Sequence, residues 1–507
     1  MAHYLLAHDL GTSGNKATLY TLDGKLVASR TCPYDTHYFN GNWAEQSPQD
    51  WWKAICDSSK ALLAAAKVSP ADIAVVALSG QMMGCTIVDK QGHCLRPSIL
   101  YCDQRAGTEA ARILSRISLK NFYKIVGHRV SPSYSIEKLM WIRKNEPKLY
   151  AKTCKTLCAK DYINFLLTGT FATDFSDASG TNAFDLNTMQ WSQKVIGIAG
   201  VDGGMFPEAK PSTEVLGTIT SQAAQATGLK EGTPVAVGGG DGSCAGVGVG
   251  CIKPGTAYNY LGSSSWIALT VKKPIVDPQM RTMNWCHCVP GYLHPSGTMQ
   301  TAGSSYSWLK NTLCDVEIEA AKTKNVSPYV LIDQAVKNTP VGANGILFLP
   351  YMLGERTPWW NPNARGAFIG LNLASSREDM LRAVMEGITM NLGIIVGIFR
   401  QHVPIKAITV IGGGAKSAVW RQMMADIYDC RVQSLNFLEE ATSMGAAVIG
   451  GVAVGQFKSF DVIDRFIRVE HTAMPIPENR KRYRKIMPIL EKSYRALVDV
   501  YEDLAAL

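Results

Sequence analysis

Short apolar runs separated by polar turns open the chain. Residues 4–9 form one such run, and residues 17–20 and 26–28 form two more on either side of Asp23-Gly24. An Asp-Gly pair between apolar runs is typical of a tight hairpin, because it tolerates the positive φ that such turns require. The pattern predicts a first strand followed by a β-hairpin.

The spacing of apolar residues then changes to that of a helix. Apolar residues recur at helical spacing over residues 51–67, after Pro48, which is a common helix-start residue. The apolar run 73–78 follows and ends at Ser79-Gly80. Strands that alternate with helices and deliver polar residues at their tips indicate an α/β fold.

The second half of the chain shows a weak echo of the first. Residues 258–261 and 266–269 flank a hydroxyl-rich turn, as the first strands flank Gly11-Thr12-Ser13. The run 407–411 ends in three glycines, as does the run before Asp241. Similarity at half the chain length predicts two duplicated α/β domains.

The length of 507 residues exceeds the size at which one hydrophobic core stops growing, so two domains with a cleft between them are expected. The repeat places these domains at residues 1–250 and 251–507. From about Pro477 onward the pattern predicts a helical extension, broken at Pro488.

Composition narrows the function classes. Hydrophobic residues make up 46% of the chain and charged residues 18%, the balance of a soluble globular protein. The net charge of +9 suits phosphorylated ligands as readily as nucleic acid, but the basic stretch 480–485 is typical of a solvated helix face. No apolar run reaches the roughly 18 residues that span a bilayer. Neither a nucleic-acid partner nor a membrane is expected.

Cysteine usage points to a reducing compartment. The thirteen cysteines lack framework spacing, and the first nine residues lack the features of a signal peptide, so a cytoplasmic protein is expected. Cys286-His287-Cys288 with His294 lacks the second ligand pair of a zinc site. We interpret these side chains as core packing.

Asp241 is the candidate catalytic residue. It follows the apolar run 234–237 and the glycines 238–240. Glycines remove side chains from a strand end, which lets the backbone and one carboxylate approach a ligand closely, and ligands in α/β sheets favour the carboxyl ends of strands. The run therefore predicts the floor of a site.

Two glycine and hydroxyl turns are candidate phosphate cradles. Gly11-Thr12-Ser13-Gly14, with Lys16 nearby, and Gly262-Ser263-Ser264 offer backbone amides and hydroxyls between strands. Asp9 precedes the first turn, where a carboxylate beside phosphates needs a divalent cation, so we expect a magnesium role; the alternative is an Asp that caps its own turn. Neither a Walker A nor a dinucleotide fingerprint is present.

These residues together resemble the FGGY family of carbohydrate kinases. Besides Asp9–Ser13 and Gly239–Asp241, further stretches match the family in order along nearly the whole chain: Ser133–Ile142, Gly366–Leu371, Asp379–Gly387 and Gly412–Ser417. The resemblance implies two actin-like ATPase (ribonuclease H-like) domains, an ATP-dependent kinase with Mg²⁺, and possible dimers of the chain.

The resemblance also implies a role for each matched residue. Asp241 is the base that accepts a proton from the sugar hydroxyl, and Asp9 holds Mg²⁺ through water. The other implied contacts are with phosphates (Thr12, Ser13, Gly14, Lys16, Gly262 and Ser263), with the nucleoside (Gly303, Gly413, Gly414 and Ala418) and with the sugar (Gln81, Met82, Met83 and Asp103, beside Asp241).

Within the family the chain is most similar to the xylulose kinases, through Trp43–Gln46, Ser79–Met82, Cys286-His287 and Pro350–Pro358. D-xylulose, converted to xylulose 5-phosphate, is therefore the implied substrate. Met83 departs from the pattern, because those kinases commonly carry a sugar-contacting His there and a thioether cannot donate a hydrogen bond.

The sequence leaves several alternatives open. They are a kinase for another ketose or polyol (ribulose, fuculose or glycerol) and a non-catalytic actin-like ATP switch. Trp43 either stacks on the sugar or packs in the core. Glu355 and Arg356 are interpreted as a buried structural pair.

Overall fold

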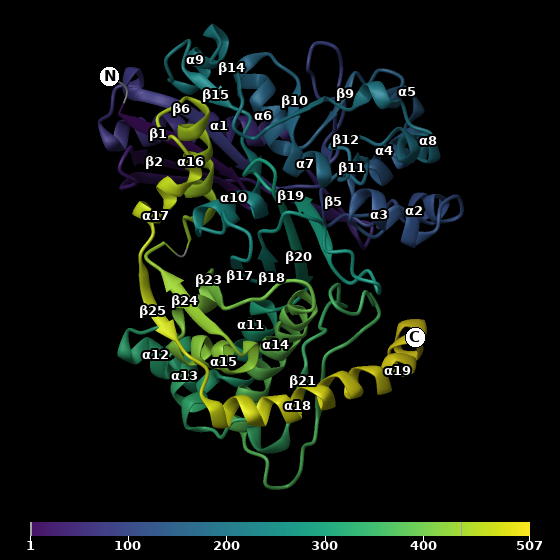
Figure 1. Cartoon of the computed structure of the whole chain (residues 1–507), viewed down its shortest axis with the longest axis vertical. Coiled ribbons are helices and arrows are strands. Elements are labelled where there is room, and N and C mark those ends of the chain that lie inside the picture. Colours follow the sequence, from purple (N-terminus) through teal and green to yellow (C-terminus); the bar gives the residue numbers. More distant parts are fainter. Residues whose placement is uncertain (1–2, 438) are drawn as a thin grey trace.

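The computed structural model describes residues 3–437 and 439–507, and its two large sheets, each seven-stranded and mixed, lie one in each half of the chain (Figure 1). Met1 and Ala2, part of the opening segment considered above, lie outside these residues. The first sheet has the strand order β14 (Val215–Thr218), β15 (Pro234–Ala236), β6 (Ile73–Gly80), β1 (Tyr4–Leu10), β2 (Gly14–Thr21) and β3 (Leu26–Pro33), and β16 (Gly239–Gly240) also pairs with β6.

The second sheet follows the same plan. Its strand order is β19 (Met283–Cys286), β20 (Leu293–Met299), β18 (Ser265–Leu269), β17 (Ala257–Leu261), β23 (Ala407–Ile411), β24 (Arg431–Leu435) and β25 (Val469–Ala473). In each sheet the first strand pairs antiparallel with the second and parallel with a later one: β1 with β2 and β6, and β17 with β18 and β23. The predicted duplication is confirmed.

The first helix illustrates why the predicted elements form. Helix α1 (Pro48–Ala66) begins with proline in its first turn, where the missing amide proton costs nothing, and ends at Lys67 in the left-handed region (φ 53°). It buries Trp51, Ile55 and Leu62 on one face, which packs against β2 and β3. The predicted hairpin is also present, as β2 and β3.

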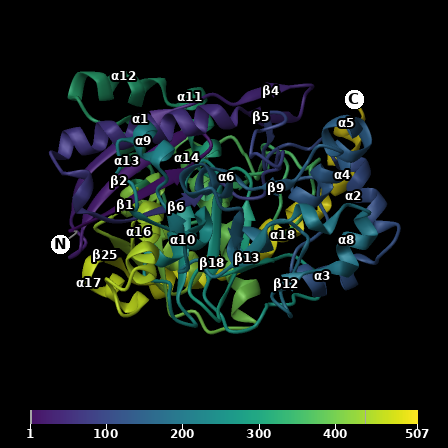
Figure 2. The same cartoon turned by 90° about the horizontal axis from the view of Figure 1, so that it is seen from above.

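A mostly helical insertion lies between β6 and β14. It lies to one side of the first sheet in two perpendicular views (Figures 1 and 2). Its longer helices are α2 (Gly107–Leu114), α3 (Leu119–Val126), α4 (Ser135–Asn145), α6 (Ala159–Thr168), α7 (Phe175–Ser179) and α8 (Gln193–Ala199).

Helices α10 (Asp241–Gly248) and α16 (Ala441–Ala453) pack against each other where the two halves meet. A Cβ atom on Gly248 would lie 1.8 Å from the carbonyl oxygen of Ala441, and one on Gly445 would lie 1.9 Å from that of Cys244. Only glycine permits this approach. Helix α16 also packs on β1 and β6, so a late segment of the chain covers the first sheet. The domain boundary near residue 250 stays a prediction.

Helix α14 (Arg377–Arg400) forms the centre of the second half. It is long and apolar enough to cross a membrane, contrary to the expectation that no segment is, but 94% of its most apolar window is buried inside the protein. Such burial is typical of a core helix. Helices α11 (Gly303–Leu313), α13 (Pro328–Asn338) and α15 (Ala418–Tyr428) pack against α14, and α12 (Asp315–Lys324) packs on α13.

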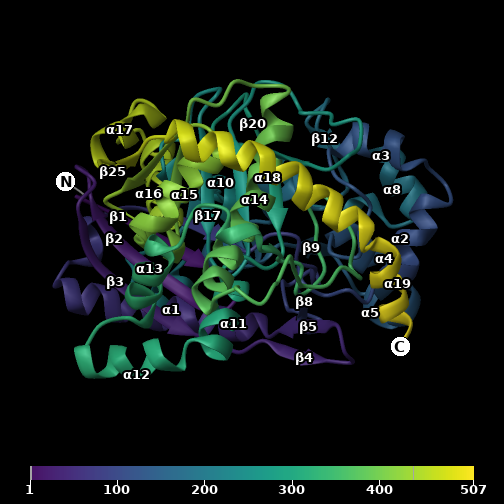
Figure 3. The same cartoon turned by 90° about the horizontal axis from the view of Figure 1, so that it is seen from below.

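The C-terminal extension differs from its prediction. Helix α18 (Pro477–Ala496) continues through Pro488 along the outside of the second half and is followed by α19 (Val498–Ala506) (Figure 3). Tyr483 on one side of the proline and Leu490 and Tyr494 on the other are buried. Packing on both sides holds the helix together, and solvent can satisfy the carbonyl that the exposed proline leaves free.

Candidate active site

Asp241 lies at the carboxyl end of a strand, as predicted. It is the first residue of α10 and follows β16, whose glycines pair with Ser79 and Gly80 of β6. Gly238 has a φ of 74°, which interrupts the predicted continuous strand. A Cβ atom on Gly240 would lie 2.6 Å from the sulfur of Met82. The glycines therefore clear the space beside the carboxylate.

Asp241 lines a cavity of about 160 Å³ that both halves of the chain build. Tyr101 and the methionines 82 and 83 come from the first half, whereas most of the remaining wall comes from the second sheet and its loops. The full lining consists of Met82, Met83, Tyr101, Asp241, Gly242, Ser243, Ser264, Trp266, Met283, Trp285, His294, Ser296, Thr298 and Arg356. Asp241 is the one carboxylate among these residues.

The environment of Asp241 makes its carboxyl a weaker acid than an exposed one. Burial, and then repulsion from Asp9, raise the pKa of Asp241 to about 7. Burial likewise raises the pKa of Asp9 to about 6, although Lys16 opposes the shift. Two neighbouring carboxylates repel each other when both are ionised. A divalent cation near them would offset that repulsion, so this pair of oxygen donors fits Mg²⁺.

The first cradle turn is held from beneath by buried side chains. Gln46 donates to the carbonyl of Thr12 at 2.6 Å, and Gln81 donates to the carbonyl of Gly11 at 3.5 Å. The Thr12 hydroxyl donates to Tyr101 at 3.3 Å, which connects this turn to the cavity. Lys16 extends to the carbonyl of Glu439 at 3.1 Å, so in this structure its ammonium contacts the second half.

The second cradle turn is fixed by hydrogen bonds from the start of α11 and by the close approach of two glycines to the preceding strand. The amide of Gly303, at the start of α11, donates to the carbonyl of Gly262 at 2.9 Å, and that of Ser304 donates to Ser263 at 3.0 Å. Gly412 and Gly414 approach Leu261 so closely that a Cβ atom on either would lie within 2.6 Å of it. The structure thus brings together Gly262, Ser263, Gly303, Gly413 and Gly414, with Ala418 beginning the next helix, α15.

The predicted sugar contacts separate into two groups. Met82 and Met83 line the cavity, and Met83 has a φ of 63°. Gln81 and Asp103 do not line it. Gln81 binds Gln46 and the first turn, and both carboxylate oxygens of Asp103 accept hydrogen bonds from Arg105.

The two readings of Trp43 are also separated. Trp43 lies among Arg105, Phe39 and Trp141, with the guanidinium of Arg105 4.0 Å from the centroid of its ring. It is not among the residues that line the cavity. The packing interpretation is the one that the structure supports.

Sequence reasoning missed most of the wall from the second half. Met283 and Trp285 on β19, and His294, Ser296 and Thr298 on β20, line the cavity. These positions alternate, so each set shares one face of its strand. The alternation is visible in the sequence, but only the packing of β19 and β20 shows which face meets Asp241.

Arg356 also lines the cavity, which corrects the interpretation of Arg356 and Glu355 as a buried pair. Among the described residues, no ion pair joins their side chains. Glu355 instead accepts hydrogen bonds from the amides of Arg356 at 2.7 Å and Gln300 at 2.8 Å.

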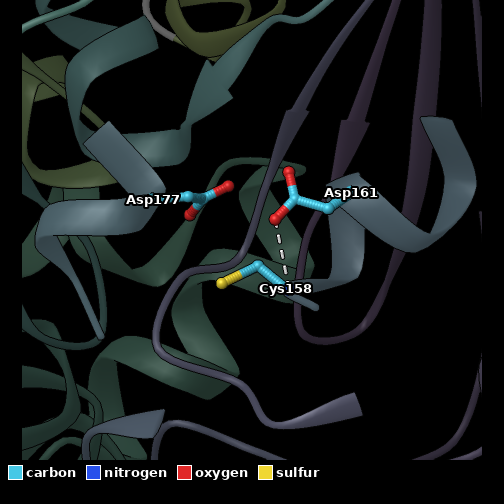
Figure 4. A group of neighbouring side chains, drawn as sticks. All are labelled: Cys158, Asp161 and Asp177. Carbon is cyan, nitrogen blue, oxygen red and sulfur yellow. Dashed lines mark hydrogen bonds between the residues drawn. The ribbon is translucent and has the colours of Figure 1, made fainter. Parts of the chain in front are cut away.

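Cys286, His287, Cys288 and His294 are buried, as the packing interpretation expects, although His294 also lines the cavity. His287 uses both ring nitrogens, since the amide of Val289 approaches one at 2.9 Å and the carbonyl of Cys251 lies 2.9 Å from the other. A different group, Cys158, Asp161 and Asp177, has its ligand atoms close together (Figure 4). There the ammonium of Lys160 lies 2.6 Å from Asp161 and 3.3 Å from Asp177, in the role a cation would take.

Comparison with known proteins agrees with this architecture. Residues 4–248 match the N-terminal domain of the FGGY family of carbohydrate kinases, and residues 257–454 match its C-terminal domain. The chain is 31% identical to a xylulose kinase of Bacillus subtilis (strain 168), over 98% of each chain. It is 30% identical to a gluconokinase of Bacillus licheniformis, over 100% of this chain and 98% of that one.

Solved structures show the same similarity in three dimensions. A ligand-bound xylulose kinase from Lactobacillus acidophilus superposes with a TM-score of 0.91 at 26% identity, covering 99% of each chain. A gluconate kinase from the same organism superposes with a TM-score of 0.90, also at 26% identity and with 99% coverage of each chain. The predicted two-domain α/β fold is confirmed, and the chain belongs to the FGGY family of carbohydrate kinases.

Proposed function

We propose that this carbohydrate kinase transfers the γ-phosphoryl group of ATP to a ketose, with D-xylulose as substrate and xylulose 5-phosphate as product. One observation carries the proposal: Asp241 lines a cavity built by both halves and lies beside Asp9 and the first cradle turn. This is the arrangement that a hydroxyl needs to meet both a base and a phosphate chain.

Asp241 acts as the general base in this proposal. It accepts the proton of one sugar hydroxyl while that oxygen attacks the γ-phosphorus in line and the bond to the β-phosphate oxygen breaks. A pKa of about 7 suits the task, because a base near the working pH is both available and strong enough to accept the proton.

The nucleotide side is assigned residue by residue from the family resemblance. Thr12, Ser13, Gly14, Lys16, Gly262 and Ser263 contact the phosphates, and Gly303, Gly413, Gly414 and Ala418 contact the nucleoside. Convergence of the second turn with Gly303 and Gly414 supports this assignment. Asp9 would hold Mg²⁺ through water, and the ion, when bound, neutralises phosphate charge.

The acceptor side supports a small polyhydroxylated molecule. The cavity offers Asp241, His294, Ser296, Thr298 and Arg356 as polar groups. Gluconate is a second candidate acceptor, because gluconokinases match the chain at nearly the same identity as xylulose kinases do. We place the reaction in the cytoplasm, since all thirteen cysteines are unpaired.

A coupled assay of ADP release with a panel of acceptors tests the proposal. D-xylulose should raise ADP release well above the rate without sugar. If gluconate or another acceptor alone does so, the enzyme class stands and the substrate is reassigned. Slow ATP turnover that no acceptor accelerates would replace the kinase proposal with an ATP switch.

A further inference from the structure

Arg356 makes no ion pair within the described residues, although the charge of Glu355 acts on it from a longer distance. The accessible part of Arg356 lines the cavity, and its Nε atom is buried without a hydrogen-bond partner among the described residues. No carboxylate in the described part of the chain lies within ion-pair distance of the guanidinium. A buried charged donor without a partner is costly, so its retention needs an explanation.

The nearest acid is committed elsewhere. One carboxylate oxygen of Glu355 accepts from the amides of Arg356 and Gln300, and the other accepts from the side-chain amide of Asn391 at 3.1 Å. Glu355 therefore fixes the main chain at Arg356 and leaves the guanidinium free.

The nearby phenols are also engaged. Tyr101 and Tyr134 are close enough to influence the charge of Arg356. Tyr101 accepts a hydrogen bond from Thr12, and the hydroxyl of Tyr134 lies 3.1 Å from a ring nitrogen of His128. Neither phenol supplies a negative charge to the guanidinium.

The rest of the wall offers Arg356 no negative charge other than Asp241. Met82, Met83, Met283 and Trp285 present thioether and aromatic surface to the cavity. Asp241 is the one lining carboxylate, and a general base must stay open to the acceptor hydroxyl. A group on the acceptor is then the partner that the geometry leaves for Arg356.

We propose that Arg356 is a specificity-determining residue that binds a planar oxygen group of the acceptor. The group is the carbonyl of an open-chain ketose or the carboxylate of a sugar acid, and the inference rests on the proposed kinase function. A guanidinium presents a rigid planar fork of donors, which matches carbonyl and carboxylate oxygens better than the separate hydroxyls of a polyol. Arg356 thereby selects against polyols that carry the same hydroxyls.

Matched acceptor pairs test the proposal. The ratio of kcat/KM values is measured for D-xylulose against xylitol, and for gluconate against sorbitol, in the wild type and in Arg356→Met. The wild type should prefer the carbonyl or carboxylate member of one pair by about 10- to 150-fold, the range for a hydrogen bond from a charged group. Arg356→Met should lose most of that preference, while its rate with the polyol changes little.

The two pairs distinguish the two sources of the oxygen group. A preference lost within the xylulose pair identifies a carbonyl, and one lost within the gluconate pair identifies a carboxylate. A uniform fall in kcat/KM for all four acceptors, or an unchanged preference, would overturn the proposal.

Two further variants separate recognition from structural damage. Arg356→Lys keeps the charge without the fork and should recover part of the preference. Arg129→Met is the matched control, because Arg129 lies over the ring of Trp360 nearby but does not line the cavity. Its preference should equal that of the wild type.

Binding to the wild type gives a measurement that needs no variant. If Arg356→Met does not fold, each polyol is tested as an inhibitor of wild-type phosphorylation of its partner acceptor. The inhibition constant of the polyol is then compared with the affinity for that acceptor. Equal affinities within both pairs contradict the proposal. Failure of the proposed function looks different, because the wild type would then phosphorylate none of the four acceptors.

Discussion

The nucleotide side and the acceptor side of the candidate site are built in different ways. The first is proposed to rest mainly on main chain: two turns whose glycines allow close approach to their neighbours, as at Gly262 and Gly303, with a few hydroxyls and Lys16 added. The second is made of side chains that strands β18 to β20 and several loops bring to Asp241. Main-chain sites tolerate only particular residues, whereas side-chain walls can change with the substrate.

Removing the proposed catalytic carboxylate is the sharpest test of this division. Asp241→Asn should lower kcat by about 10²- to 10⁴-fold, because a general base contributes that much to proton transfer. Its affinity for ADP, measured by calorimetry, should stay near that of the wild type, since the nucleotide side is separate. A parallel loss of ADP binding would show that the two sides are not independent.

The pH dependence of catalysis tests the same carboxylate. Because the pKa of Asp241 is raised to about 7, the fraction of usable base falls tenfold for each pH unit below that value. The kcat/KM for the acceptor should therefore rise with pH up to about 7 and be roughly 100-fold lower at pH 5 than on the plateau. A profile that stays flat down to pH 5 would contradict this environment.

The contribution of Asp241 to folding stability changes with pH in the opposite direction to its contribution to catalysis. The carboxyl of Asp241 has a folded pKa above its unfolded value, so its protonated form favours the folded state. That contribution is present below the unfolded pKa, near 3.9, and is lost as the pH rises through about 7.

The contact between α10 and α16 tests how rigidly the halves meet. Gly248→Ala places a methyl group 1.8 Å from a carbonyl oxygen, which no side-chain rotation relieves. We expect the free energy of unfolding to fall by about 3 kcal/mol, measured by urea denaturation. Gly397→Ala on α14 is the control, because nothing lies within 4 Å of the added atom. Equal stabilities of the two variants would refute the close packing.

The smallest effect concerns the main chain that leads to Asp241. The hydroxyl of Ser176 accepts from the amide of Gly240 at 2.8 Å and donates to Asp174. Ser176→Ala leaves that buried amide unpaired and should lower the free energy of unfolding by about 1 to 2 kcal/mol. Ser47→Ala is the comparison, since the Ser47 side chain makes no capping hydrogen bond at the start of α1. A larger effect at Ser47 would be evidence against this role.

Local patterns predicted much of the fold. The hairpin at Asp23-Gly24, helix α1, strand β6 and the repeat of the first strands in the second half all follow from period and turn chemistry. The break at Pro488 was wrong, because burial of Tyr483 and Leu490 on either side outweighs one lost hydrogen bond. Local propensity yields to packing at such positions.

The acceptor side was only partly predictable. Met82 and Met83 were expected in the cavity and line it, whereas Asp103 binds Arg105 instead. Arg356 was noticed in the sequence and was interpreted as one half of a buried structural pair with Glu355. The structure shows the Glu355 carboxylate bound to main-chain amides.

The sequence by itself determined the glycines, the hydroxyl turns, Asp241 and the family to which they belong. The glycines and hydroxyl turns act through local backbone conformation, which neighbouring residues in the sequence largely dictate. Only the tertiary structure decided which side chains face Asp241, how far its pKa rises and that Arg356 lacks a protein partner. Each of these depends on burial and on charges from distant segments, and neither quantity is a property of local sequence.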